Sequence, residues 1–461
     1  MSDKSQFVIV SNRLPVHRVK RNRSDTWQTS PGGLVSAMKP ILQQHPGNTW
    51  IGWAGDAGPA PKPFEHDGIS NRPVGLSASE IQNFYEGFSN GTLWPLYHDA
   101  IRTPEYRRRW WWPYVDVNRR FAEVACQIVG KHGVVWVHDY HFQLVPAMIR
   151  DMRPDVRIGF FLHIPFPPQE LFSQLPWRKE ILEGLLGADV IGFQTRLGAQ
   201  NFARLCKKFV GVTGARDLLE YRGRTVETTA FPISIDVDHL EKLVRSDSVI
   251  RRCQTYHSKL GPNRKIILGV DRMDYTKGID IRLRAFQELL RSQRITVDEC
   301  VMIQVATPSR ERVAEYRQLR SEVERYVGEI NGEFGELGRP AVYYLHRNLP
   351  IEELVAMYLA ADVMLVTPLR DGMNLVAKEY VASRTNHTGA LVLSEFAGAA
   401  KELRSALLFN PHDIDGLEAV IYTALNMPKN EQVRRMRSLR RVLKQHDIFH
   451  WANTFMNALK T

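Results

Sequence analysis

Short apolar runs rich in β-branched and aromatic residues recur along the whole chain, and amphipathic stretches separate them. Because these runs are too apolar for sheets that expose one face to water, they predict parallel strands covered by helices on both faces. The sequence therefore predicts a doubly wound α/β fold. The runs are FVIVS, VVWVH, RIGFFLH, DVIGFQ, KIILGV, VMIQVA, VYYLH, DVMLVT, ALVLSE and ALLFN.

A charged region around residues 241–265 divides these runs into two groups. A chain of 461 residues is too long for one compact core, and a hydrophobic content of 44% suffices for two cores. We therefore predict an N-terminal domain over 1–237, a C-terminal domain over 238–445 and a terminal helix over 446–461.

Polar and charged side chains follow the predicted strands directly. Ligands of doubly wound sheets bind beyond the carboxyl ends of the strands, so these side chains are candidates for a binding site. The residues in this position are Ser11, Asn12, Arg13, His138, Asp139, Tyr140, His141, His163, Asp271, Arg272, Lys277, Arg310, Asp371, Gly372, Met373 and Asn374.

Two segments could bind phosphate groups. Gly32 and Gly33 precede a helix-like stretch, where an anion could approach the backbone N–H groups, although a simple tight turn is the alternative. Arg272 and Lys277 lie between a predicted strand and a predicted helix. Two cations there could neutralise the diphosphate that leaves a nucleotide sugar, because that group gains negative charge as its glycosidic bond breaks.

The segment LRDGMNLVAKEY combines two carboxylates with a run of backbone N–H groups through Leu375. Asp371 could contact sugar hydroxyls, the amides could contact phosphate, and Glu379 could contact a ribose diol. The alternative is that Asp371 caps the helix and Glu379 is solvated.

An acceptor that carries a phosphate would suit a second group of side chains. Arg13 and Arg310 could both donate to one phosphate, and the aromatic rings of Tyr85 and Trp94 could close over a sugar.

Metal ligands are not indicated by the spacing. The string Asp236-Val237-Asp238 has no accompanying ligand cluster, so we interpret it as structural, and His138, His141 and His163 fit hydrogen-bonding or core roles better than metal binding. The four cysteines form no CxxC or Cys/His cluster, which favours a reducing compartment. We predict no metal and no cofactor.

The formal charge of +11 suits anionic partners, but the basic residues are widely spread. They are locally dense at 102–112 and 434–441, and we interpret the second segment, RRMRSLRR, as a solvated helix face rather than a nucleic-acid site. No apolar run approaches the roughly 18 residues of a membrane span, and no signal peptide is recognisable. We expect a cytoplasmic protein that binds neither nucleic acid nor membrane.

Long ordered strings resemble the trehalose-6-phosphate synthase family, glycosyltransferase family 20, and in particular its actinobacterial members. The resemblance runs from about residue 7 to the C-terminus. The strings are SNRLPV, SPGGLVSA, YEGFSNGTLWPLYH, VWVHDYHFQLVP, IGFFLHIPFPPQELFSQLPW, GVDRMDYTKGID, ATPSRERV and TPLRDGMNLVAKEYVA.

The resemblance implies a retaining, metal-independent transferase of the GT-B type, with two Rossmann-like domains facing a cleft and a last helix that returns to the first domain. It implies transfer of glucose from a nucleotide-glucose to glucose 6-phosphate, with the acceptor on the N-terminal domain and the donor on the C-terminal domain. Attack would occur on the front face, without an enzymic nucleophile. A homo-oligomer is possible, and since no aspartyl-phosphatase signature occurs, a separate trehalose-6-phosphate phosphatase would act downstream.

The same resemblance implies residue roles. Acceptor binding is expected from Arg13, Tyr85, Trp94, Asp139 and Arg310. The reacting centre is expected to contain Arg272, Lys277, Asp139 and His163. Donor binding is expected from Gly32, Gly33, His163, Arg272, Lys277, Leu349, Asp371, Gly372, Met373, Asn374, Leu375, Val376 and Glu379.

One departure concerns the nucleotide base. Where enteric members carry an aromatic residue and an arginine, this chain has Asn348, Leu349, Pro350 and Ile351, so UDP-, GDP- and ADP-glucose all stay open as donors. Two other functions also stay open: a related transferase that makes another sugar or pseudo-sugar phosphate, and a catalytically silent sugar-phosphate sensor. Both are disfavoured, because the acceptor residues and the donor residues of the family are present.

Overall fold

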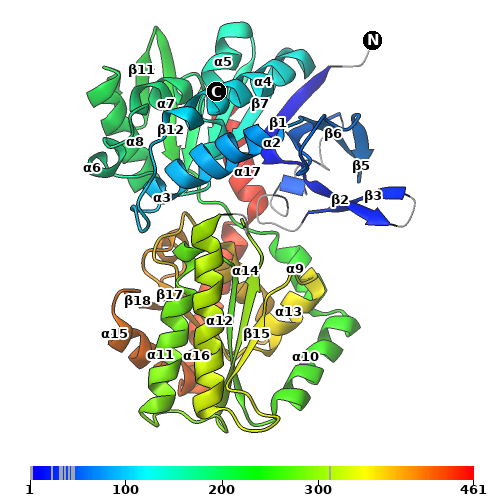
Figure 1. Ribbon diagram of the computed structural model, residues 1–461, viewed down its shortest axis with the longest axis vertical. Coiled ribbons are helices and arrows are strands. Elements are labelled where there is room, and N and C mark those ends of the chain that lie inside the picture. Colours follow the sequence, from blue (N-terminus) through cyan, green and yellow to red (C-terminus); the bar gives the residue numbers. More distant parts are fainter. Residues whose placement is uncertain are drawn as a thin grey trace. The chain divides into compact units, whose positions relative to one another are not determined.

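The computed structural model describes residues 4–21, 24–30, 35, 38–39, 42, 47–310 and 313–460. The chain divides into two compact units. The first unit contains Met1–Ile233 and Phe449–Thr461, and the second contains Ser234–Ile448. Each unit is built around its own sheet, which is mainly parallel in the first unit and wholly parallel in the second (Figure 1).

The sheet of the first unit has a parallel core with the strand order β12-β9-β8-β7-β1-β4-β6. From β1 the chain adds β4 and β6 on one side of the sheet. It then returns to the other side of β1 and adds β7, β8, β9 and β12, so the strand order reverses between β1 and β7. Antiparallel strands complete both edges, and β2 and β3 form a separate hairpin. The strands are β1 (Ser5–Arg13), β2 (Val16–Arg21), β3 (Ser24–Thr29), β4 (Thr49–Trp53), β5 (Phe64–His66), β6 (Ile69–Pro73), β7 (Val129–His138), β8 (Arg157–Phe161), β9 (Val190–Phe193), β10 (Thr213–Ala215), β11 (Leu218–Tyr221) and β12 (Arg224–Ala230).

The last helix of the chain, α17 (Ile448–Lys460), packs on the sheet of the first unit, where Figure 1 draws it in red. The ring of Phe455 stacks on Trp136 of β7 with 4.4 Å between ring centroids. Gly159 and Gly192 make room for it, because a Cβ atom at either position would come within 3 Å of that ring. The other helices of this unit are α2 (Ala78–Glu80), η1 (Ile81–Leu93), α3 (Trp94–Tyr97), α4 (Arg108–Ile128), η2 (Tyr140–Phe142), α5 (Val145–Met152), α6 (Gln169–Phe172), α7 (Arg178–Leu185) and α8 (Arg196–Phe209).

The sheet of the second unit is parallel throughout and has the order β15-β14-β13-β16-β17-β18. This order is that of a dinucleotide-binding Rossmann sheet, and it reverses between β13 and β16. The prediction of a doubly wound α/β fold is therefore confirmed. The strands are β13 (Lys265–Arg272), β14 (Cys300–Thr307), β15 (Val342–Leu345), β16 (Val363–Val366), β17 (Ala390–Ser394) and β18 (Leu407–Phe409).

Helices cover the second sheet, and the described part of the chain contains no helix that is long and apolar enough to cross a membrane. The Asp236 carboxylate accepts a hydrogen bond from the N–H of His239 at 2.9 Å and so caps the first of these helices, which agrees with a structural role for the DVD string. The helices are α9 (Val237–Val244), α10 (Asp247–Leu260), η3 (Tyr275–Lys277), α11 (Ile279–Arg291), α12 (Ala314–Phe334), α13 (Ile351–Ala360), α14 (Leu375–Ser383), η4 (Gly398–Lys401), α15 (Ile414–Leu425) and α16 (Lys429–Gln445).

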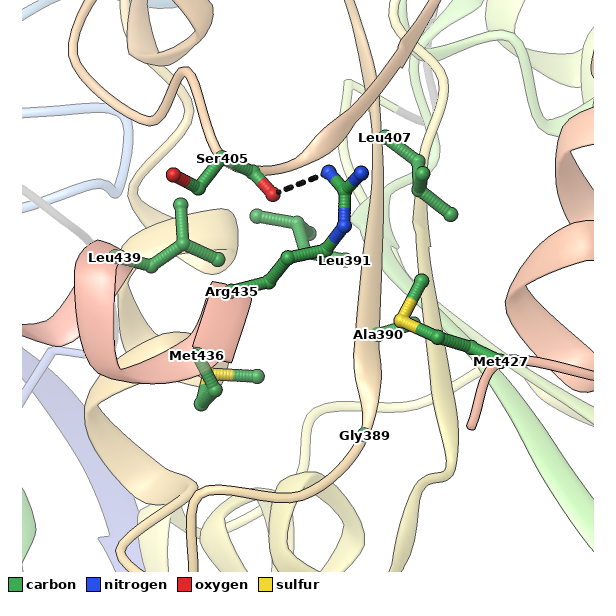
Figure 2. Close-up of a pocket in the computed structure, with 9 residues that line it drawn as sticks. All are labelled: Gly389, Ala390, Leu391, Ser405, Leu407, Met427, Arg435, Met436 and Leu439. Carbon is green, nitrogen blue, oxygen red and sulfur yellow. Dashed lines mark hydrogen bonds between the residues drawn. The ribbon is translucent and has the colours of Figure 1, made fainter. Parts of the chain in front are cut away.

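Helix α16 carries the basic segment 434–441, and its apolar side packs against the start of β17 (Figure 2). Met436 and Leu439 are buried there. The guanidinium of Arg435 donates to the carbonyl oxygen of Ser405 at 3.0 Å. The hollow between these side chains measures about 10 Å³, which is too small for an organic ligand.

Candidate active site

In the second unit, the predicted donor residues gather where the strand order reverses. Lys277 follows β13 and Asp371 follows β16, and the Lys277 ammonium lies 2.5 Å from the Oδ2 atom of Asp371. The amide of Asn374 donates to the same oxygen at 3.1 Å. The structure therefore brings together residues from the two loops that border the reversal, which is the usual ligand position in such sheets.

Asn374 fixes the turn between the loop and α14. This residue has φ +80°, and its side chain accepts a hydrogen bond from the N–H of Ala377 at 3.1 Å. Asn374 is thus the cap of α14, and the alternative that Asp371 caps this helix is wrong. Because the cap leaves the carboxylate of Asp371 to Lys277, the first turn of α14, with Leu375 and Val376, begins directly beside an ion pair.

A buried ion pair between Asp271 and Arg282 connects the strand ends at this site. The Asp271 carboxylate lies 2.6 Å from the guanidinium of Arg282, which is completely buried. Arg282 also donates to Thr367 at the end of β16 at 2.8 Å and to the carbonyl oxygen of Lys277 at 3.2 Å. Burial raises the pKa of Asp271 to about 6, and the charge of Arg282 opposes this rise. One guanidinium thereby ties together the strand ends on both sides of the reversal.

Arg310 is engaged with a carboxylate. Its guanidinium lies 3.0 Å from the Oδ2 atom of the buried Asp274 and contacts the hydroxyl of Tyr316. Burial acts to raise the pKa of Asp274, but the charges of Arg310, Arg272 and Lys277 outweigh it and lower that pKa. Arg310 thus belongs to a group of cations around Asp274 that also includes the exposed Arg272.

Glu379 lies in the middle of α14 and is not simply solvated. The hydroxyl of the buried Tyr358 on α13 donates to its Oε2 atom at 2.9 Å. Burial raises the pKa of Glu379, and the hydrogen bond from Tyr358 lowers it. Leu349, which was predicted near the nucleotide base, is buried just before α13.

In the first unit, Arg13 ends β1 next to the reversal between β1 and β7. Its guanidinium lies over the ring of Trp53 at 4.1 Å from the ring centroid. Gly55 has φ +109°, and a Cβ atom there would lie 2.0 Å from an Nη atom of Arg13. The exposed Arg13 is therefore held in place by an aromatic face and by a glycine that leaves room for it.

A chain of aromatic rings leads from Arg13 to the other predicted acceptor residues. Trp53 contacts Tyr85 at 5.7 Å between ring centroids, and Tyr85 stacks on His141 at 5.9 Å. Trp94 lies 5.5 Å from Tyr140, which neighbours His141. Tyr85 lies on the π-helix η1, a rare element that is often found at functional sites. The structure thus brings Arg13, Tyr85 and Trp94 into one aromatic network.

Asp139 and His163 lie beside each other at the ends of β7 and β8. Asp139 has φ +76°, a conformation that non-glycine residues rarely adopt, and its Oδ1 atom accepts a hydrogen bond from the N–H of His163 at 3.3 Å. The rings of His138 and His163 approach at 3.1 Å between Nδ1 and Nε2. Burial lowers the pKa of His163 to about 3 and, with the neighbouring His163, lowers the pKa of His138 well below its usual value.

The predicted glycine pair and the possibility of a metal site remain to be considered. Gly32 and Gly33 lie outside the described residues. Among the described residues, no three histidine, cysteine, aspartate or glutamate side chains are grouped in a way that could hold a metal ion.

Several site residues escaped the sequence analysis. Arg282 could have been noticed as a cation on the apolar face of the helix GIDIRLRAF, where a charge requires a partner. Trp53 and Gly55 could have been noticed in TWIGWAG, but only as a possible sugar platform. Tyr358 carries no local signal, because its partner Glu379 lies on another helix.

Comparison with known proteins identifies the relatives of this chain. The model of glycosyltransferase family 20 matches residues 5–461. The trehalose-6-phosphate synthase of Mycolicibacterium smegmatis is 55% identical over 469 residues, which cover 100% of this chain and 93% of that protein.

Two solved structures are also similar. An α,α-trehalose-phosphate synthase (UDP-forming) from Burkholderia xenovorans, in complex with glucose-6-phosphate, matches with a TM-score of 0.90 and 34% identity over 99% of this chain and 100% of that chain. A structure from E. coli bound with UDP-2-fluoro glucose matches with a TM-score of 0.90 and 34% identity over 99% of both chains. The GT-B type of fold, with two parallel-sheet domains, is confirmed. By the family model and by this degree of identity, the chain belongs to glycosyltransferase family 20.

Proposed function

We propose that this protein transfers glucose from a nucleotide-glucose to glucose 6-phosphate, with retention at the anomeric carbon. The products are α,α-trehalose 6-phosphate and a nucleoside diphosphate. The observation that carries the proposal is the donor-type site at the reversal of the second sheet, where Lys277, Asp371 and the first turn of α14 lie together. Family membership and the activity named for the relatives support the same reaction.

The donor is assigned mainly to the second unit. The ammonium of Lys277 and the guanidinium of Arg272 bind the diphosphate, and the N–H groups at the start of α14 add the positive end of a helix dipole. The Asp371 carboxylate, already bonded to Lys277 and Asn374, orients sugar hydroxyls. Glu379 binds the ribose diol, with its carboxylate oriented by Tyr358. Gly372, Met373, Leu375 and Val376 provide backbone contacts, and Gly32, Gly33 and His163 complete the assigned set.

The acceptor is assigned mainly to the first unit. Arg13 binds the phosphate of glucose 6-phosphate, because it is an exposed guanidinium that Trp53 and Gly55 hold in one position. Tyr85 and Trp94 contact the sugar ring, and the Asp139 carboxylate accepts a hydrogen bond from a sugar hydroxyl. Arg310 is assigned a second phosphate contact, for which it would exchange its bond to Asp274.

The chemistry needs charge stabilisation more than acid–base groups. The anomeric hydroxyl oxygen of the acceptor forms a bond to the anomeric carbon of the donor glucose, while the bond from that carbon to the diphosphate oxygen breaks on the same face. The acceptor proton passes to the departing oxygen. Arg272 and Lys277 stabilise the negative charge that accumulates on the diphosphate. His163, with its pKa lowered to about 3, is neutral at physiological pH and contributes a hydrogen bond rather than a proton.

The proposal is tested by offering the purified protein glucose 6-phosphate with UDP-, GDP- or ADP-glucose in separate reactions that contain EDTA. We expect trehalose 6-phosphate and the matching diphosphate from at least one donor, detected by mass spectrometry. The donor that gives product identifies the base. A protein that binds glucose 6-phosphate but gives no product with any donor contradicts the proposal and favours the sensor.

A further inference from the structure

The second unit has a basic groove past the C-terminal end of α14, whereas Asp371 and Asn374 of the assigned donor set lie at the N-terminal end of this helix. It is an open hollow of about 590 Å³, which falls within the range of small-molecule sites. We call it the α16 groove. Its lining residues are Glu241, Arg245, Thr385, His387, Arg437, Arg440, Arg441, Lys444 and Gln445.

The cations of the α16 groove form one stripe along the helix. Arg437, Arg440, Arg441 and Lys444 are spaced by three and four positions, so their side chains share a face of α16. The five cationic side chains of the lining face a single carboxylate, Glu241.

The carboxylate of Glu241 already forms ion pairs with three of these cations. It lies against the buried Arg440 at 2.5 Å, and it also pairs with Lys444 at 2.9 Å and with Arg245 at 3.3 Å. Exposed Arg437 and Arg441 make no ion pair or side-chain hydrogen bond with any described residue. The groove therefore holds an excess of positive charge that the protein itself does not neutralise.

A half-buried histidine lies within this positive field. The Nδ1 atom of His387 is shielded from solvent and has no hydrogen-bond partner among the described residues. Burial lowers the pKa of His387, and the charges of Arg440, Arg437 and Lys444 lower it further, with only Glu241 opposing them. The groove thus combines a positive field with an unused polar atom.

Helix α14 lies between this groove and the donor residues Asp371 and Asn374. The N-cap of α14 is Asn374, which donates to Asp371, whereas the groove lies past the last helical residue, Ser383. Nine helical residues span about 13 Å. Arg440 closes the far end of the helix by donating to the carbonyl oxygens of Val381, at 3.0 Å, and Ala382.

Among the arginines of the segment 434–441, only Arg437 and Arg441 lack an ion pair with a described residue. Arg434 and Arg435, on the same helix, both pair with Glu431, and Arg435 also donates to Ser405 (Figure 2). An extended nucleic acid would need a longer row of available cations than Arg437 and Arg441 supply.

We propose that the α16 groove is a second anion site, distinct from the donor and acceptor sites, that binds a small ligand carrying phosphate or diphosphate groups. Arg437 and Arg441 supply the main contacts, and Lys444 and Arg245 border the ligand. The segment RRMRSLRR, interpreted from sequence as a solvated face, thereby gains a binding role for part of its length.

The test uses inorganic pyrophosphate and isothermal titration calorimetry on the full chain at low salt. The groove variant is Arg437→Gln/Arg441→Gln. Its matched control is Arg320→Gln/Arg325→Gln, which removes the same charge from exposed ion pairs on α12. A third variant, Lys277→Ala, removes a cation from the assigned donor site.

We expect two classes of pyrophosphate site in the unmodified protein. The groove variant loses one class, with Kd raised at least tenfold, while the control variant keeps both, and Lys277→Ala keeps the class that the groove variant loses. Identical isotherms for the groove and control variants overturn the proposal. It is also overturned if Lys277→Ala abolishes the same class, or if a single-stranded oligonucleotide binds the groove while pyrophosphate does not. Should the double variant misfold, Arg441→Gln alone gives the same comparison, because this side chain is exposed.

Discussion

The ammonium of Lys277 lies 2.5 Å from the Asp371 carboxylate, and this bond joins residues 94 positions apart in the sequence. The two residues come from the loops after β13 and β16, which border the reversal of the second sheet. The pair is mostly buried and further bonded to Asn374, so its geometry is defined before any donor binds. Preorganised charge of this kind is what transfer from a nucleotide sugar requires.

Asp371→Asn tests that pair. The amide keeps the shape of the side chain but removes the charge that orients Lys277, so we expect kcat/KM for the nucleotide-glucose to fall by about tenfold to hundredfold. Steady-state kinetics with varied donor measures the loss. Asp415→Asn, an exposed carboxylate in the same unit, is the control and should leave kcat/KM unchanged. Equal values for the two variants would contradict the role of Asp371.

Arg272→Ala tests charge stabilisation of the leaving diphosphate. Loss of one such contact costs on the order of 3 kcal/mol, so kcat at saturating donor should fall about a hundredfold. Arg291→Ala, on the exposed side of α11, controls for the loss of an arginine in the same unit. Near-normal turnover of Arg272→Ala would remove this residue from the mechanism.

Tyr358→Phe tests the orientation of Glu379. Loss of the 2.9 Å hydrogen bond should raise KM for the donor by about tenfold to hundredfold with little change in kcat, since a net hydrogen bond to a charged group contributes about 1.5–3 kcal/mol. A donor that lacks the ribose hydroxyls should bind equally to both proteins. If Tyr358→Phe weakens the binding of both donors to the same extent, Glu379 does not bind the ribose hydroxyls.

The same variant carries a pH signature. Burial raises the pKa of Glu379 and Tyr358 lowers it, so Tyr358→Phe moves this pKa further up. The carboxylate form, which binds the diol, is lost as the pH falls through the folded-state pKa. We therefore expect the acidic limb of kcat/KM to shift to higher pH in Tyr358→Phe, and an unshifted limb would contradict this assignment.

Arg282→Met tests the buried ion pair. It leaves Asp271 unpaired in the core, and removal of one member of such a pair costs about 3–5 kcal/mol of unfolding free energy. Asp271 already has a pKa raised to about 6 by burial, and loss of Arg282 raises it further. A group with a raised folded-state pKa stabilises the protein when protonated, and this contribution is lost as the pH rises. The deficit of the variant relative to the unmodified protein should therefore shrink between about pH 8 and about pH 5.5 in urea unfolding, and a constant deficit would contradict it.

His138 and His163 should both remain uncharged near neutral pH. Burial lowers the pKa of His163 to about 3 and the pKa of His138 well below its usual value. Since both pKa values are higher in the unfolded chain, the pair stabilises the fold above about pH 6.5, and that stability is lost as the pH falls. Nitrogen-15 NMR of the two imidazoles should show no titration between about pH 5 and pH 8. A midpoint near the ordinary value for either ring would contradict this prediction.

Much of the core could be read from sequence, because a strand that is buried on both faces must be apolar along its whole length. The runs FVIVS and KIILGV became the central strands β1 and β13 of their sheets. Strands of mixed composition were not predicted from the sequence. TWIGW is the fully buried β4, yet its aromatic residues and glycine resemble a loop as much as a strand.

The sequence by itself also determined which side chains lie near the strand ends, because chain order places Arg13, Lys277 and Asp371 within a few residues of apolar runs. Only the tertiary structure decided their partners. The bonds from Lys277 to Asp371, from Tyr358 to Glu379 and from Arg282 to Asp271 join different elements, and the local pattern of either member does not contain the other. Periodicity reports how one element meets solvent and core, whereas a long-range pair depends on strand order, and the order of a sheet arises from the packing of the whole unit.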